Sequence, residues 1–170
     1  QGVENPIFGS FSLPVGMQSN ILFGYYGESA RPSVVKFPSN DNSYDVTDKA
    51  LRIAQQHPEL NADMQFIQEA AMLHDIGIFK TYAPDLFCEG EHAYICHGYL
   101  GSEPMQQEGY PKHALVCERH TGTGLALDYI IKEDLPIPHR EMLPISLEEQ
   151  IICFADKFFS KTHLGEERNI

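Results

Sequence analysis

The sequence has few basic residues for a protein of 170 amino acids, with 12 lysines and arginines against 24 aspartates and glutamates. The formal net charge is −12 at pH 7. Nucleic acids and anionic membranes are bound mainly through Lys and Arg, so this balance argues against nonspecific binding to either. The net charge does not exclude a small phosphorylated substrate, because a bound metal ion can dominate the local charge of a site.

Cysteines and long apolar runs are also scarce. The four cysteines, Cys88, Cys96, Cys117 and Cys153, lack the dense spacing of a small secreted disulfide scaffold, which favours reduced thiols. No stretch approaches the roughly 20 apolar residues of a membrane-spanning helix, and residues 1–16 lack the basic and apolar blocks of a signal peptide. We therefore expect a cytoplasmic protein that does not bind membranes.

The remaining composition, 42% hydrophobic and 21% charged, is typical of a globular domain. Residues 1–44 are interrupted by prolines, glycines and serines, so we predict an irregular N-terminal segment with a short strand around Ile21–Tyr26. The helical pattern that follows predicts one domain at 45–165, with a C-terminal tail at 166–170.

Apolar residues at three- and four-residue spacing predict an all-α fold for that domain. Asn61 or Asp63 is placed to cap the second helix, and Ser146 opens a capping box before the last one. Pro104 is expected to kink or interrupt the third helix. The predicted helices cover about 46–57, 63–76, 94–108, 111–120 and 146–159.

Five residues with ligand chemistry lie on these helices: His74 and Asp75 end one helix, His97 and His120 lie on the next two, and Asp156 lies in the last. A carboxylate within an apolar helix is rarely buried unless it is paired or binds a metal. A lone histidine is more often a hydrogen-bonded core residue, but the order of these five residues favours a shared site.

The segment from Ala71 to Gly77, which contains His-Asp-Ile-Gly, and the later Phe154-Ala155-Asp156-Lys157 resemble the HDIG-type HD superfamily of metal-dependent phosphohydrolases. The resemblance is to small uncharacterised bacterial members. It implies an HD-domain helical bundle that binds one or two divalent ions, such as Fe, Mn, Zn or Mg. The implied reaction is hydrolysis of a phosphomonoester, phosphodiester or nucleotide by a metal-activated water.

The resemblance also implies roles for individual residues. His74 and Asp75 would be catalytic, and the metal ligands would be His74, Asp75, His97, His120 and Asp156. Lys80, Arg119 and Lys157 lie near the motifs and are candidates to bind substrate phosphate, although such residues are more often solvated. The family usually has a first histidine ligand where this chain has Asn42, and an amide is a poorer ligand for most transition metals.

Two other interpretations remain open. Cys96, His97, Cys117 and His120 supply two thiols and two imidazoles, which would suit a structural zinc site. Alternatively, the chain is a catalytically impaired HD-fold module that binds a metal or nucleotide without hydrolysis, because Asn42 replaces the first ligand.

Overall fold

The computed structural model describes residues 21–24, 33–36 and 43–159, apart from residue 87. Internal contacts divide the chain into two units, residues 1–41 and 42–170, each described by itself. In the first unit, strand β1 (Ile21–Gly24) pairs antiparallel with strand β2 (Ser33–Lys36). Strand β1 lies where a strand was expected, whereas β2 was not predicted.

The second unit is mostly helical, which confirms the all-α prediction. All five predicted helices are present, and a sixth, α5, was missed because it has only six residues and buries only Ile130. None of the helices in the described part of the chain combines the length and apolar character needed to cross a bilayer. The α-helices are α1 (Ser43–Gln56), α2 (Met64–Leu73), α3 (His97–Gln107), α4 (Pro111–Arg119), α5 (Leu127–Lys132) and α6 (Leu147–Asp156).

Short elements connect these helices. The 3-10 helices are η2 (Pro58–Leu60), η3 (Ile76–Lys80), η4 (Pro84–Leu86) and η5 (Tyr94–Cys96). Strands β3 (Tyr82–Ala83) and β4 (Cys88–Glu89) form a second antiparallel pair. The predicted helix at 94–108 includes η5, but the other short elements were not predicted, because each has five residues or fewer and carries no periodic pattern.

Two helix caps fix where α2 and α6 begin. Asp63 accepts a hydrogen bond from the Phe66 backbone N–H at 3.0 Å, which decides between the two predicted caps of α2. Ser146 and Glu149 form the predicted capping box at the start of α6. Each cap satisfies backbone donors that a helix N-terminus leaves unpaired, and so sets the register of the apolar face that follows.

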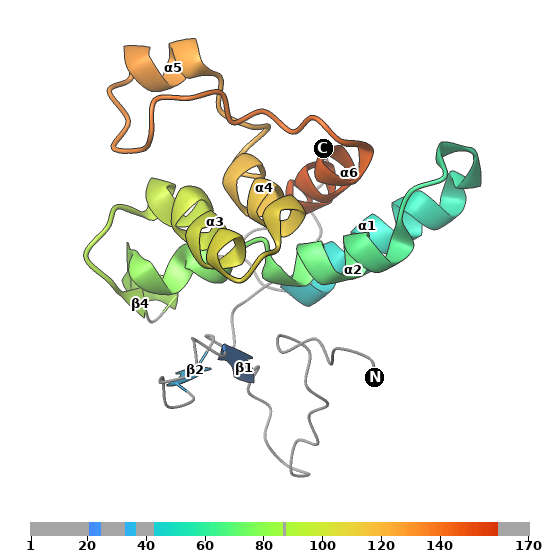
Figure 1. Cartoon of the computed structure of the whole chain (residues 1–170), viewed down its shortest axis with the longest axis horizontal. Helices are drawn as coiled ribbons and strands as arrows, with labels where there is room; N and C mark the ends of the chain where they lie inside the picture. The colour runs from blue at the N-terminus through green and yellow to red at the C-terminus, as the bar shows by residue number, and fades with distance from the viewer. Residues whose placement is uncertain (1–20, 25–32, 37–42, 87, 160–170) are drawn as a thin grey trace. The chain divides into compact units, whose positions relative to one another are not determined.

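Helices α1, α2, α4 and α6 enclose one apolar core, and a smaller one lies between α3, α5 and the segment after α5 (Figure 1). Ile67 and Ile152 are fully buried in the first, and burial of such a side chain stabilises a fold by about 1.5–3 kcal/mol. Ile130 and Met142 are buried in the second. The end of α2, η3 and α4 connect the helices that line these two cores.

Glycines allow the backbones of η3, α3 and α4 to touch. A Cβ atom at Gly77 would lie 2.0 Å from the His97 carbonyl oxygen and 2.4 Å from the Gly101 nitrogen. A Cβ atom at Gly98 would lie 2.8 Å from the Cys117 carbonyl oxygen. Only glycine fits at these contacts, which bring the chain just after Asp75 against the start of α3.

We therefore expect Gly77→Ala to lower the free energy of unfolding by roughly 3 kcal/mol or more, because the atoms that a methyl group would meet are backbone. The comparison is Gly109→Ala, where φ is +83° and no other atom lies within 4 Å, so that only the backbone conformation costs energy. That cost is about 1–2 kcal/mol. Urea unfolding of both variants tests the difference, and equal losses would contradict the close-contact argument.

Candidate metal centre

The structure brings together all five side chains that the sequence marked as candidate metal ligands. His74 follows the last residue of α2, Asp75 lies between α2 and η3, and His97 is the first residue of α3. His120 follows α4, and Asp156 is the last residue of α6. The cluster therefore forms where four helices begin or end.

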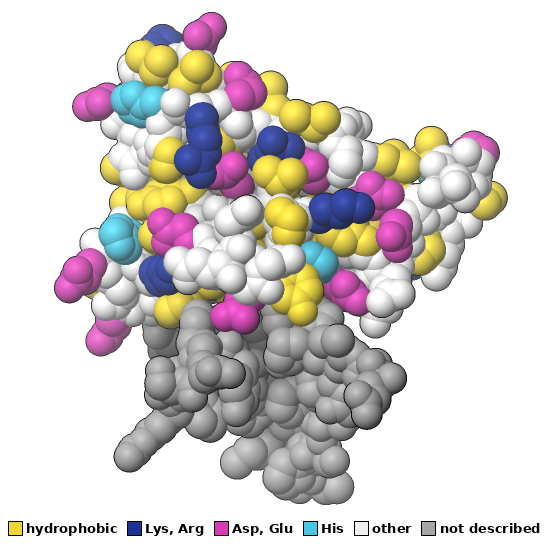
Figure 2. Space-filling model, in the orientation of Figure 1, with side chains coloured by type: hydrophobic (Ala, Val, Ile, Leu, Met, Phe, Trp, Pro, Cys, Tyr) yellow, Lys and Arg dark blue, Asp and Glu magenta, His cyan; other side chains and the backbone are white. Residues whose placement is uncertain are grey.

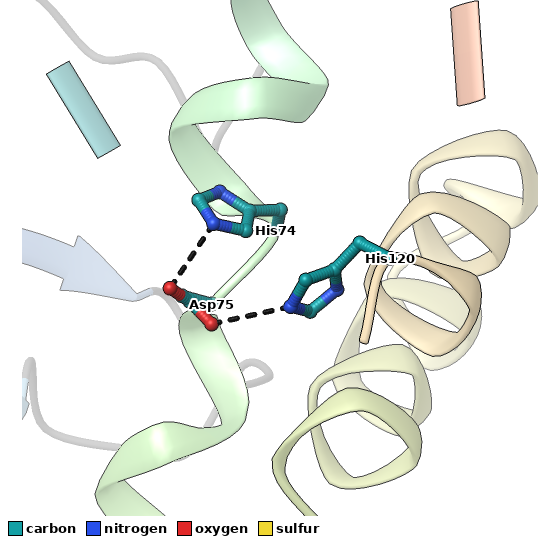
Figure 3. Close-up of side chains that lie close together, drawn as sticks. All are labelled: His74, Asp75 and His120. Carbon is teal, nitrogen blue, oxygen red and sulfur yellow. Dashed lines mark ion pairs between the residues drawn. The ribbon is translucent and has the colours of Figure 1, made fainter. Parts of the chain in front are cut away.

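The carboxylate of Asp75 lies at the centre of this group. Its Oδ2 atom is 3.0 Å from His74 Nε2, and its Oδ1 atom is 3.4 Å from His97 Nε2 and 3.3 Å from His120 Nε2. Figure 3 shows the carboxylate between the rings of His74 and His120, with one oxygen turned to each. Asp156 joins the Oδ2 side, since its Oδ1 atom is 3.5 Å from His74 Nε2.

The three histidines are held in the same way by the backbone. The Nδ1 atoms of His74, His97 and His120 lie 2.6, 2.7 and 2.7 Å from the carbonyl oxygens three residues earlier. A carbonyl only accepts, so each Nδ1 is the protonated nitrogen and donates the bond. In the neutral ring, Nε2 then carries a lone pair, and all three Nε2 atoms face Asp75.

The electrostatics of the cluster favour a positive charge. His74, Asp75, His97 and His120 are buried, and the Asp156 side chain is 16% exposed. Burial alone would lower the pKa of His74, but the negative charges of Asp75 and Asp156 outweigh it and hold that pKa well above its usual value. The two carboxylates thus favour a positive charge beside His74.

The donor set fits a divalent metal ion. His97 Nε2 lies only 3.1 Å from His120 Nε2, so two lone pairs would face each other if both rings were neutral and nothing lay between them. One ligand atom each from His74, Asp75 and His120 lie within 4.8 Å of one another. Imidazole and carboxylate ligands together suit Fe, Mn, Zn and similar ions.

A comparison with protein-family models identifies the family: the HD domain model matches residues 41–160 of this chain. The chain belongs to the HD domain family. The matched region includes every candidate ligand, from His74 to Asp156, and the six α-helices of the described residues. No solved structure matches the chain in a structural search.

Three curated relatives of this HD domain chain are archaeal, which does not support the expected resemblance to bacterial proteins. An uncharacterised protein of Methanocaldococcus jannaschii is 32% identical over 66% of this chain and 59% of its own length. A tRNA (cytidine(56)-2′-O)-methyltransferase of Thermoplasma volcanium is 28% identical over 68% of this chain and 30% of its own length. The corresponding methyltransferase of Picrophilus torridus is 30% identical over 65% of this chain and 28% of its own length.

The three basic residues singled out in the sequence have different surroundings. Lys80 Nζ lies 3.2 Å from the Leu100 carbonyl oxygen and 3.4 Å from Glu103, and Arg119 lies 3.0 Å from Glu149. Lys157 directly follows Asp156 and is partly buried. Their role toward a substrate stays a prediction.

Two other sequence-based expectations concern residues around the cluster. Asn42, the expected position of a first histidine ligand, lies outside the described residues. The zinc alternative is not supported: the thiols of Cys96 and Cys117 donate to the carbonyls of Pro136 and Leu73, and burial raises the pKa of both thiols. In the described part of the chain, neither thiol belongs to a group of side chains that could share a metal.

Sequence reasoning missed the ion pairs of the two residues that precede His120. Arg119 bonds the buried Glu149, whose carboxylate also accepts the backbone N–H of Ile145, and the buried Glu118 bonds Arg140. These pairs anchor the end of α4 to α6 and to the segment before it. The capping box marked Glu149 in the sequence, but nothing marked Arg119 as its partner.

The raised pKa of His74 predicts opposite effects of pH on the stability of the metal-free protein and on its affinity for metal. Protonated His74 contributes stability that is fully present below the usual pKa of 6.5 and is lost as pH rises through the raised pKa. A metal ligand must be the neutral ring, so affinity for Co²⁺ should increase over the same pH range. Thermal unfolding of chelator-treated protein and Co²⁺ titrations, each across this range, measure the two trends.

The exposed His57, which pairs with Glu59 at the surface, provides the control. His57→Gln should leave both pH trends unchanged, because this side chain lies outside the cluster. An affinity for Co²⁺ that does not vary with pH would contradict the assignment of His74 as a ligand.

Proposed function

We propose that this chain is a metal-dependent phosphohydrolase, in which His74, Asp75, His97, His120 and Asp156 hold one or two divalent ions. The observation that carries the proposal is the division of partners around Asp75. Oδ2 faces His74, which also contacts Asp156, while Oδ1 faces His97 and His120. A carboxylate with ligands on both sides is suited to bridging two cations.

The protein residues have distinct tasks in this reaction. When bound, the divalent ions would supply Lewis-acid chemistry, both polarising the phosphate and making water a better nucleophile. Asp75 and His74 bind and orient the ions at the centre of the site. The carbonyls of Ala71, Tyr94 and Cys117 fix the ring orientations, so that little reorganisation is needed during the reaction.

The proposed substrate is a phosphomonoester, phosphodiester or nucleotide. Lys157 directly follows Asp156 in the sequence, as Arg119 directly precedes His120. For Lys80 and Arg119, a phosphate would have to replace the carbonyl and carboxylate acceptors that they already have.

The surface supports a small substrate in preference to a nucleic-acid polymer. On the face shown in Figure 2, Lys and Arg side chains are interspersed with Asp and Glu, and they form no broad basic patch there. Two relatives are named as tRNA methyltransferases, but this chain covers less than a third of their length. We therefore do not extend tRNA binding to this chain.

We also propose a cytoplasmic location. The four cysteines are buried and none forms a disulfide, which suits a reducing compartment.

Elemental analysis of protein purified without chelator should find Fe, Mn or Zn at one or two ions per chain. The His74→Ala, Asp75→Ala double variant should lose this metal, because it removes the central ligands. A matched double variant, Asp128→Ala with His139→Ala, changes the same residue types at exposed positions and should retain it. Phosphatase and phosphodiesterase assays on each form test the reaction.

The outcomes separate enzyme from binding module. Metal that is lost only in the first variant, together with hydrolysis, supports the phosphohydrolase. Metal without hydrolysis favours the impaired module that Asn42 suggested. A wild-type protein that stays free of metal and inactive after divalent ions are added would refute the proposal.

The division around Asp75 further predicts that His120→Ala removes one ion of two, because it deletes a ligand on the Oδ1 side alone. The ion near His74 and Asp156 should remain. Its affinity should fall by about 10–100-fold at most, which is the usual effect of mutating a residue that contacts a metal ligand without binding the metal itself. Metal titration by calorimetry counts the sites. Loss of all metal in this variant would indicate a single shared ion.

A further inference from the structure

Lys80 makes a contact that a solvated lysine would not make. Its Nζ atom donates a hydrogen bond to the backbone carbonyl of Leu100 at 3.2 Å, across the junction between η3 and α3. Leu100 is 4% exposed, so its surroundings offer little water to that carbonyl. The second contact of Lys80, to Glu103 at 3.4 Å, joins two partly exposed groups and is expected to contribute little.

The sequence explains why the Leu100 carbonyl oxygen needs a hydrogen-bond donor from outside its own helix. In an α-helix this oxygen accepts from the N–H four residues later, and here that residue is Pro104, which has no N–H. Helix α3 nevertheless continues through Pro104 to Gln107, so the proline removes this one hydrogen bond without ending the helix. The ammonium group of Lys80 supplies the hydrogen bond that the proline removes.

This bond lies at the junction that sets the geometry of the candidate metal centre. Lys80 ends η3, which begins directly after Asp75, and Leu100 lies one turn beyond His97 on α3. The same two elements touch where Gly77 meets the His97 carbonyl. Movement between η3 and α3 would therefore change the 3.4 Å separation of Asp75 Oδ1 and His97 Nε2.

We propose that Lys80 is a positioning residue: it replaces the hydrogen bond lost at Pro104 and thereby holds His97 in register with Asp75. The proposal rests on the proposed metal-binding function for its effect on affinity. It differs from the phosphate-binding role predicted from the sequence, because the ammonium group binds a backbone carbonyl of the protein in place of a substrate phosphate.

The test combines Lys80→Met with Pro104→Ala. Lys80→Met removes the ammonium group and keeps the apolar stem, and we expect about tenfold weaker Co²⁺ binding, as for partners that orient metal ligands. Pro104→Ala restores the backbone N–H that can bond the Leu100 carbonyl. In that background, Lys80→Met should change Co²⁺ affinity by no more than about twofold, the usual scatter of additive effects.

Two controls isolate the bond to Leu100. Lys112→Met removes an exposed lysine of α4 and should leave Co²⁺ affinity unchanged. Glu103→Gln removes the other partner of Lys80 and should likewise have little effect, because that pair is partly solvated.

Each outcome has one meaning. Rescue by Pro104→Ala supports the positioning role. A Lys80→Met variant with unchanged Co²⁺ affinity but a raised KM for substrate, in both backgrounds, would overturn it in favour of phosphate binding. If the wild-type protein binds no Co²⁺, the proposed function fails. The hydrogen-bond replacement is then still tested by the midpoints of thermal unfolding of the wild type, Lys80→Met, Pro104→Ala and the double variant: Lys80→Met should lower the midpoint less in the Pro104→Ala background than in the wild type.

Discussion

The packing of the helical unit depends on the contacts between the buried carboxylate of Asp75 and the three histidines around it. A charge that is 2% exposed is strongly disfavoured unless positive groups or hydrogen-bond donors surround it. Its neighbours are three imidazoles from three different elements, so the carboxylate specifies where α2, α3 and α4 must meet. The glycines at these contacts follow from that requirement, since a side chain at Gly77 or Gly98 would hold the elements apart.

The directions of the helices add to this requirement. Helices α2, α4 and α6 all end at the cluster, with His74, His120 and Asp156 at their C-terminal ends. The C-terminus of a helix carries a partial negative charge from its unpaired carbonyls, which stabilises a nearby cation by about 0.3–1 kcal/mol at exposed sites and more when partly buried. Three such ends and two carboxylates favour a cation at this point, and the two carboxylates also raise the pKa of His74.

Much of this could be predicted from the sequence because periodicity and ligand chemistry agree there. His74 lies on the apolar face of a capped helix, and Asp156 is a carboxylate that directly follows the apolar residues 151–155. The motifs of the HD family then placed His97 and His120. Local patterns could not show the short α5, because it has too few residues for a period to appear. The partners of Lys80 and Arg119 were also beyond such reasoning, since they lie 20 and 30 residues away in the chain.

Pro104 shows why local rules are incomplete at such positions. Proline disfavours a helix interior by about 3 kcal/mol, chiefly through the lost hydrogen bond and the clash with the preceding turn. A donor from another element offsets part of that cost, and no window of sequence around Pro104 contains Lys80. The two apolar cores are lined by different helices, and the candidate ligands lie at the ends of helices that line both: α2, α4 and α6 for the larger core and α3 for the smaller. A cation bound among those ligands would therefore stabilise the junction between the cores as well as act on a substrate, since binding energy at residues on several elements is also folding energy.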